Sequence, residues 1–355
     1  MARLLTPTVL RRGFEIFALG SLVSFLVLLF YSNNTAAFLA AIPRIRWGWV
    51  LLGAGLASLD WFGGGLRNWV LARVIMPDPS LKGMVLAGGM GAFASYLTPL
   101  QAGNAPMTLY TMKRFGIPMP VGFTVVLMSF IATIAFFAIA GPLAIAFGAG
   151  RSLGAHGIVL GISLYDLFVA SLSAFFVLGV LLLAVMLFPK LVRRLVHRIA
   201  LAIGRRNQWM AGKLEGLERG IDQTEEAVTA FKSARGWLSL ALATVISGPS
   251  HANKLLAGYV SLRAIGIEAQ FVDVLLLQTL ITFLLYFAPT PGGSGIAELI
   301  SAAVMSIYVP RELTPLYTLL WRLVLSYYTI AFGAAVFSSW VRKGLKGVEQ
   351  DPSTT

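Results

Sequence analysis

Apolar runs of about 20 residues, long enough to cross the hydrocarbon core of a bilayer as helices, recur along the chain between short polar segments. We predict that six of these runs are full membrane spans. They lie at roughly 15–33, 47–74, 119–148, 165–188, 236–262 and 313–340. The pattern therefore predicts an all-α polytopic membrane protein, with a single membrane domain over residues 1–355.

Two further apolar stretches, 82–116 and 270–308, are each interrupted near the middle by a polar turn. The turns read TPLQAG at 98–103 and TPGGSG at 290–295, so both follow the pattern T-P-x-x-x-G. Neither half of either stretch is long enough to cross a core of about 30 Å at about 1.5 Å per residue. We therefore expect two re-entrant helical hairpins, although pairs of short tilted spans are an alternative.

Lysine and arginine gather on one side of the predicted spans, as they do on the cytoplasmic side of membrane proteins. This places both termini in the cytoplasm. The first hairpin then enters from the cytoplasm and the second from outside. The unit span–hairpin–span at 47–148 would recur upside down at 236–340, which is an inverted repeat. The basic segment 189–235 between them is predicted to be a cytoplasmic linker with a helix lying on the inner leaflet.

Composition supports the membrane class and excludes several functions. The mean hydropathy is +0.79 and 12% of residues are charged, against about 25% in soluble domains. There is no cysteine, and the three histidines lie far apart, so we expect no metal site, cofactor or catalytic residue. The chain is therefore not expected to be an enzyme. The net charge of +13 reflects topology, and nucleic acid is not expected as a partner.

The hairpin turns are the first candidate binding site. Each turn leaves a helix N-terminus inside the membrane, where free N–H groups and the helix dipole attract anions. We expect the new helices to begin near Asn104, as N-cap, and near Ser294 or Gly295. Two such ends facing each other would bind a negative group, with a lipid phosphate as the leading candidate. The candidate residues are Thr98, Gln101, Gly103, Asn104, Thr290, Gly292, Gly293, Ser294, Gly295 and Glu298.

Ionisable side chains inside the predicted spans are a second set of candidates, because charges at this depth are costly unless they are paired or hydrated. They are Asp60, Arg67, His251, Lys254 and Arg322. They either share a hydrated cavity or form structural pairs. The pairs would be Asp60 with Lys254, and Glu298 with Arg322. Glu298 either caps its helix or titrates during transport.

Residues 289–298 read PTPGGSGIAE and resemble the P-x-P-G-G-x-G-x-x-E signature of a flippase-like membrane family. This family includes the transmembrane domain of lysylphosphatidylglycerol synthase, and the resemblance covers essentially the whole chain. It implies a lipid translocase in the bacterial inner membrane. The first hairpin departs from the family pattern P-x-R-x-G-E-x-x-R, because Gln101, Asn104 and Met107 replace its charged residues. No soluble aminoacyl-transferase domain follows residue 340, so aminoacylation of lipid is not expected.

The leading interpretation is a flippase that moves a phosphate-bearing phospholipid or polyprenyl-linked lipid between leaflets, with membrane lipids as its partners. One alternative is an ion-coupled secondary transporter of a small organic anion. Another is a non-transporting membrane partner of a lipid-synthesis system. The sequence leaves the headgroup, direction and energy coupling open, and it is compatible with a homo-oligomer.

Overall fold

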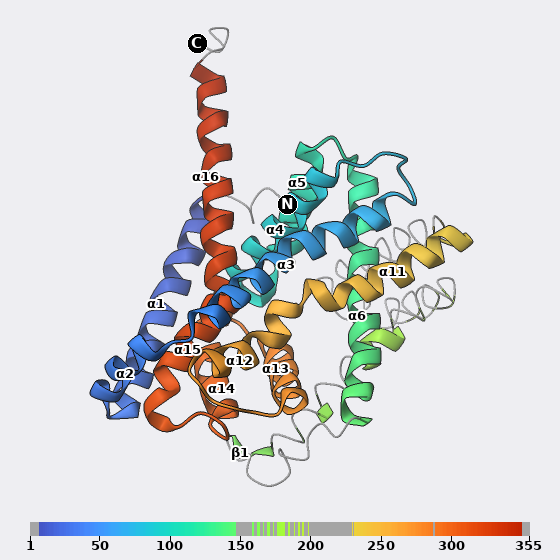
Figure 1. The fold of residues 1–355 in the computed structure, drawn as a ribbon. Helices are drawn as coiled ribbons and strands as arrows, with labels where there is room; N and C mark the ends of the chain where they lie inside the picture. Colours follow the sequence, from blue (N-terminus) through green and yellow to red (C-terminus); the bar gives the residue numbers. More distant parts are fainter. Residues whose placement is uncertain are drawn as a thin grey trace.

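The computed structural model describes residues 7–146, 231–286 and 288–349, with scattered positions between 158 and 229 (Figure 1). These residues are almost wholly helical, with one short antiparallel pair between β1 (Ile158–Val159) and β2 (Ile162–Ser163). Among them, three helical stretches are long and apolar enough to cross a membrane. They are Thr8–Ser32, Met119–Leu143 and Arg311–Trp340. The helical membrane class is therefore confirmed, while the arrangement of six spans and two re-entrant hairpins stays a prediction.

The helices follow the predicted segments closely. The N-terminal part contains α1 (Pro7–Ser32), α2 (Thr35–Ala41), η2 (Ile42–Arg44), α3 (Trp47–Ala72), α4 (Leu81–Tyr96), η3 (Pro99–Gln101), α5 (Asn104–Arg114) and α6 (Met119–Ala146). The C-terminal part contains α11 (Ala234–Ser250), α12 (Ala252–Ala264), α13 (Phe271–Tyr286), η4 (Pro291–Gly293), α14 (Ile296–Met305), η5 (Arg311–Leu313), α15 (Thr314–Arg322), a π-helical turn η6 (Leu323–Tyr327) and α16 (Tyr328–Glu349). Most of the predicted fourth span, 165–188, and of the linker, 189–235, lies outside the described residues.

Helix α3 is central in the fold and packs along α4 on one side and along α11 and α12 on the other (Figure 1). Glycine makes this close approach possible. A Cβ added to Gly63 would lie 2.9 Å from the Cα of Ser250 in α11, and one added to Gly88 of α4 would lie 2.8 Å from the backbone nitrogen of Gly65. Small residues at helix contacts are typical of membrane proteins, because they let backbones approach and gain van der Waals contact.

The predicted fifth span, 236–262, is divided into two helices. Helix α11 ends at Ser250 with Pro249 in its last turn, and α12 begins at Ala252. His251 stands between them with φ −113° and ψ 9°. Proline has no N–H and clashes with the preceding turn, so it favours an interruption here. The break turns polar side chains of the run 247–254 toward α3.

The two interrupted stretches form helix–turn–helix hairpins, α4–η3–α5 and α13–η4–α14. The first helix of each ends before a proline, because proline disfavours helical backbone at the preceding residue. Thr98 and Thr290 are accordingly extended, with ψ of 143° and 151°. The two turns are in contact, and the N–H of Leu100 donates a hydrogen bond of 3.2 Å to the carbonyl oxygen of Ala288.

The two turns share an unusual backbone conformation at positions 192 residues apart. Leu100 (φ 52°, ψ 24°) corresponds to Gly292 (φ 57°, ψ 17°). The next residues, Gln101 and Gly293, are also left-handed, with φ of 54° and 66°. Glycine adopts this region readily, whereas other residues are strained there. The repeated T-P-x-x-x-G pattern thus corresponds to a repeated turn.

In the first hairpin the helix begins at the expected place, but its N-cap differs by one residue from the expectation. Helix α5 begins at Asn104 itself, and Gly103 is the N-cap with right-handed helical backbone. Asn104 therefore makes no side-chain cap. The second hairpin agrees with the expectation, since Gly295 is the N-cap of α14.

Candidate functional site

A cavity of about 580 Å³ lies between α3, the first hairpin, α6 and the α11–α12 break. Six of the predicted site residues line it, from three separate segments of the chain: Asp60, Arg67, Gln101, Asn104, His251 and Lys254. Its other wall is apolar and comes largely from α6, with Phe123, Val126, Phe130 and Ile134. The ionisable residues of α3 and α12 thus share a cavity with the first hairpin. A shared cavity was one of the two alternatives that the sequence left open, and structural ion pairs were the other.

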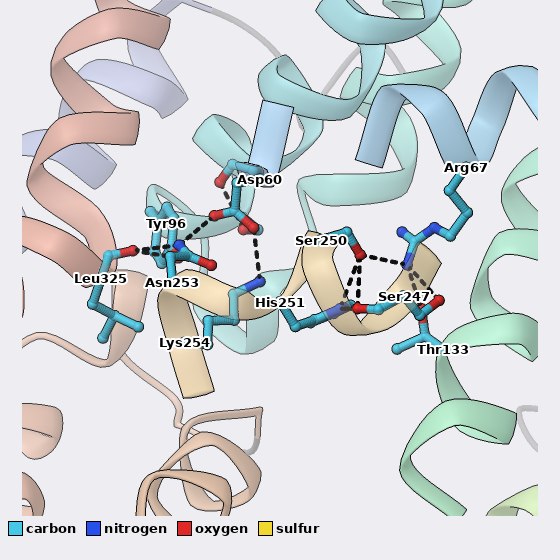
Figure 2. Close-up of polar contacts among 12 residues, drawn as sticks. Asp60, Arg67, Tyr96, Thr133, Ser247, Ser250, His251, Asn253, Lys254 and Leu325 are labelled. Atoms are coloured by element: carbon cyan, nitrogen blue, oxygen red, sulfur yellow. Dashed lines mark hydrogen bonds and ion pairs between the residues drawn. The ribbon is translucent and has the colours of Figure 1, made fainter. Parts of the chain in front are cut away.

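Asp60 and Lys254 also form the pair that the second alternative anticipated (Figure 2). The Lys254 Nζ lies 3.5 Å from Asp60 Oδ1, and the Asn253 side-chain amide donates a hydrogen bond of 2.7 Å to Asp60 Oδ2. The same amide nitrogen lies 3.3 Å from the Leu325 carbonyl oxygen, which ties the pair to the π-helical turn η6. The side chain of Asp60 is 4% exposed and that of Lys254 is 15% exposed. The two charges cancel at the cavity wall.

Arg67 carries a charge that is not cancelled in this way. Its Nη1 donates to the hydroxyls of Thr133, Ser247 and Ser250 at 2.8, 3.2 and 3.4 Å (Figure 2). Its Nε has no hydrogen-bond partner, and no carboxylate lies within 4.0 Å of the guanidinium in the part of the chain that the structure describes. The cavity wall therefore holds an excess positive charge with unused donors, which favours an anion.

His251 is held at the helix break beside Arg67. Its Nδ1 lies 2.8 Å from the Ser247 carbonyl oxygen and 3.1 Å from the Ser250 hydroxyl. Because a carbonyl oxygen only accepts, the proton of the ring is assigned to Nδ1. The ring also packs edge-on against Phe137 of α6, with 5.4 Å between ring centroids. His251 thus lines the cavity in a fixed orientation.

The tip of the second hairpin is organised by a buried ion pair. Arg322 of α15 donates from Nε to Glu298 Oε1 and from Nη2 to Glu298 Oε2, both at 2.8 Å. The same guanidinium donates to the carbonyl oxygens of Gly292 and Gly293 at 3.0 and 3.3 Å. The side chains are 1% and 2% exposed for Arg322 and Glu298. Here the pairing that the sequence suggested is present in the structure.

Glu298 occupies the helix end that was expected to attract a ligand. Its Oε2 accepts the N–H of Gly295 at 2.9 Å, and its Oε1 accepts the hydroxyl of Ser21 from α1 at 2.7 Å. The carboxylate therefore caps α14, as in a capping box. The expectation of two open helix N-termini facing a shared anion does not hold in this conformation, because the protein's own carboxylate fills the second one.

The remaining tip residues close their own turns. Thr98 Oγ1 donates to the Ala94 carbonyl oxygen and accepts the N–H of Gly103, both at 2.8 Å. Thr290 donates to the Ser294 carbonyl oxygen at 2.9 Å. Between the tips lies a hole of about 20 Å³, whose lining includes Thr98, Gln101, Lys254, Thr290, Gly292 and Gly293. A hole of this size holds about one water molecule.

Sequence reasoning missed one wall of the Arg67 site. Ser247, Ser250 and Asn253 belong to the polar run 247–254, which marks the break but does not say which side chains face α3. Thr133 is one of three hydroxyl side chains in an otherwise apolar span. Because threonine in a membrane helix commonly bonds its own backbone, as Thr133 does to the Ser129 carbonyl oxygen at 3.0 Å, it gives no signal of a site.

Comparison with known proteins identifies the family. The model of the lysylphosphatidylglycerol synthase TM region matches residues 16–333. A UPF0104 membrane protein of Archaeoglobus fulgidus is 24% identical over 322 residues, which cover 89% of this chain and 94% of the relative. No solved structure matches the chain. The chain belongs to the lysylphosphatidylglycerol synthase TM family and is a membrane protein.

Proposed function

We propose that this member of the lysylphosphatidylglycerol synthase TM family is a flippase, which moves a phosphate-bearing lipid between the leaflets of a bacterial inner membrane. The headgroup binds in the large cavity, at Arg67 and Lys254. The observation that carries the proposal is Arg67, a cation with unused donors and no carboxylate partner among the described residues, facing a cavity of about 580 Å³. The proposed activity is transport and involves no catalytic step.

The chemistry of the cavity supports an anionic headgroup. Arginine binds phosphate through several N–H groups at once, and Nη1 of Arg67 makes all three of its hydroxyl bonds, which leaves Nη2 for a ligand. Lys254 also lines the cavity and adds a second cation, paired with Asp60. Gln101 and Asn104 offer uncharged amides from the first hairpin. An anion entering here meets two cations.

The hairpins support an alternating-access cycle. We propose that they are re-entrant, that the halves 47–148 and 236–340 form an inverted repeat, and that both termini lie in the cytoplasm. The equal left-handed turns at Leu100 and Gly292 support this relation. Transporters of this construction bind substrate where broken helices of the two repeats meet, and one repeat rocks against the other. Rocking would open the cavity to each leaflet in turn.

The test is lipid transport in reconstituted vesicles. Wild-type protein is expected to move fluorescent phosphatidylglycerol or a labelled polyprenyl phosphate across the bilayer, read as loss of fluorescence to an impermeant reductant. The two lipids distinguish the two sources of phosphate. Arg67→Ala is expected to slow transport at least about tenfold, which corresponds to about 1.4 kcal/mol in the activation free energy. Arg311→Ala is the control, because Arg311 is exposed and lies outside the cavity. Wild-type rates equal to those of protein-free vesicles for both lipids would reject the proposal.

A small organic anion is the second candidate, since the polar side of the cavity suits a water-soluble ligand equally well. Uptake of a soluble phosphate ester into vesicles, without movement of either lipid, would favour that transporter class. The difference between the two lies in whether the protein also binds a hydrocarbon chain.

A further inference from the structure

A second groove lies beside the large cavity and has almost no polar surface. Its volume is about 230 Å³. Helix α6 forms one side with Ile131, Ile134 and Ala138, and Phe176, Gly179 and Val180 form the other. From Ile131 to Ile139, which also lines it, the groove follows α6 for about 12 Å at about 1.5 Å per residue. We infer that this groove binds the hydrocarbon chain of the same lipid whose headgroup binds at Arg67.

The groove adjoins the cavity. Ile134 lines both, and Leu178 lines the cavity while its neighbours Phe176, Gly179 and Val180 line the groove. The change from polar to apolar takes place within two consecutive residues of α6. The hydroxyl of Thr133 accepts the hydrogen bond from Arg67, and the next residue, Ile134, faces the groove. A ligand that fills both spaces is therefore charged at one end and apolar at the other.

The groove also faces the membrane. Helix α6 contains one of the candidate spans, and Ile139, Phe176 and Val180 are each about half exposed at its rim. A hydrocarbon chain can enter from the bilayer without crossing water. The groove meets the cavity at Ile134, which follows Thr133, the hydrogen-bond partner of Arg67.

Gly179 sets the width of the junction. A Cβ added there would lie 3.1 Å from Cγ2 of Ile134, which is already tight contact. A larger side chain at 179 would displace Ile134, which lines both the groove and the cavity. Glycine at this position thus lets the 176–180 segment pack against α6 where the two spaces meet.

The inference rests on the proposed function, and its test separates the two. Two variants obstruct the chain at different points: Gly179→Leu at the junction and Ala138→Trp within the groove. Leu143→Trp is the control, because Leu143 lies on the same helix, is exposed and lines neither space. Each protein is assayed for transport of long-chain phosphatidylglycerol and for binding of glycerol phosphate, which has the headgroup without the chains.

Both groove variants are expected to transport the long-chain lipid at least about tenfold more slowly, while they bind glycerol phosphate as the wild type does. Retained binding also shows that they are folded. Arg67→Ala is expected to lose both. Normal transport by Ala138→Trp and Gly179→Leu would overturn the inference and leave the proposed function standing. Loss of transport by Leu143→Trp to the same degree would also overturn it, since a general effect on α6 would then explain the result.

Discussion

The tips of the two hairpins have the same turn and different surroundings. Leu100 in the first tip is 59% exposed, and its neighbour Gln101 faces the large cavity. Gly292 in the second tip is held by Arg322, whose guanidinium also binds Glu298. One backbone conformation therefore faces the large cavity in one half and a buried ion pair in the other. A repeated sequence motif indicates repeated shape, but not repeated chemistry.

The charges around the tips follow the same division. The first tip has Gln101 and Asn104 where the family pattern has charged residues, and the cations of its cavity come from α3 and α12 instead. The second tip has its own cation and its own anion, in a buried network with Ser21 of α1. The first tip thus has no charged side chain of its own, whereas the two charges of the second tip neutralise each other.

The largest expected effect is at the buried pair of the second tip. Glu298→Ala leaves the Arg322 guanidinium without its carboxylate and should lower the free energy of unfolding by about 3–5 kcal/mol. Denaturant unfolding of the detergent-solubilised protein measures it. Glu15→Ala is the matched control, because the Arg11–Glu15 pair is exposed and should cost about 0–1 kcal/mol. If Glu298→Ala and Glu15→Ala lower the free energy of unfolding by similar small amounts, the ion pair does not hold the second tip.

The next effect tests the turn itself. Gly292→Ala places a Cβ at positive φ and within 2.7 Å of the Tyr96 carbonyl oxygen. It should destabilise the protein by about 2 kcal/mol, from backbone strain and from separation of the tips. Gly55→Ala is the control, since Gly55 lies in a helix with open space around its Cα and alanine favours helix there. Equal stability of Gly292→Ala and wild type would show that the contact between the tips contributes little.

A smaller effect, of opposite sign, is expected at the cavity. Asp60→Asn keeps an oxygen for the Asn253 amide but removes the negative charge that restrains Lys254. Glycerol phosphate should then bind about tenfold more tightly, which corresponds to about 1.4 kcal/mol of binding free energy. This change is well below the interaction energy of two unit charges about 4 Å apart, which is about 4 kcal/mol at an effective dielectric constant of about 20. Isothermal titration with the purified protein measures this. Unchanged or weaker binding would mean that Lys254 does not face the ligand.

The smallest effect compares the two tips at equivalent positions. Leu100→Gly gives the first turn the glycine that the second turn already has, and it relieves the strain of a left-handed backbone at a non-glycine residue. Little packing is lost, because the Leu100 side chain is mostly exposed. We expect a gain of no more than about 1 kcal/mol, because glycine also adds entropy to the unfolded chain. Thermal unfolding of Leu100→Gly beside Leu100→Ala separates strain from lost packing. A loss of stability only in the glycine variant would contradict the expectation.

Much of the fold follows from the sequence by simple physics. The length of the apolar runs identifies α1, α3 and α6 as helices. Threonine–proline pairs mark the ends of α4 and α13. The cost of intramembrane charge anticipates the partners of Asp60 and Glu298. These predictions succeed because each depends on local backbone chemistry or on the number of charged groups available.

The site was less predictable because it depends on which helices meet. Arg322 follows Gly292 by 30 residues, and only the packing of α15 against η4 brings its guanidinium to that turn's carbonyl oxygens. Thr133 becomes an Arg67 partner because α6 crosses α3 at that level. The N-cap of α5 is Gly103 and not Asn104, because Gly103 adopts helical backbone and takes the N-cap position.

The narrow hole between the tips bears on whether protons and ions can leak across the membrane. In the proposed cycle the headgroup moves on the α6 side of Lys254, and the opposite side is closed by the bond from Leu100 to Ala288 and by a space for about one water. A continuous water wire would let protons and ions leak down their gradients. Because the hole holds only about one water, the proposed cycle would carry lipid headgroups while the membrane potential is preserved.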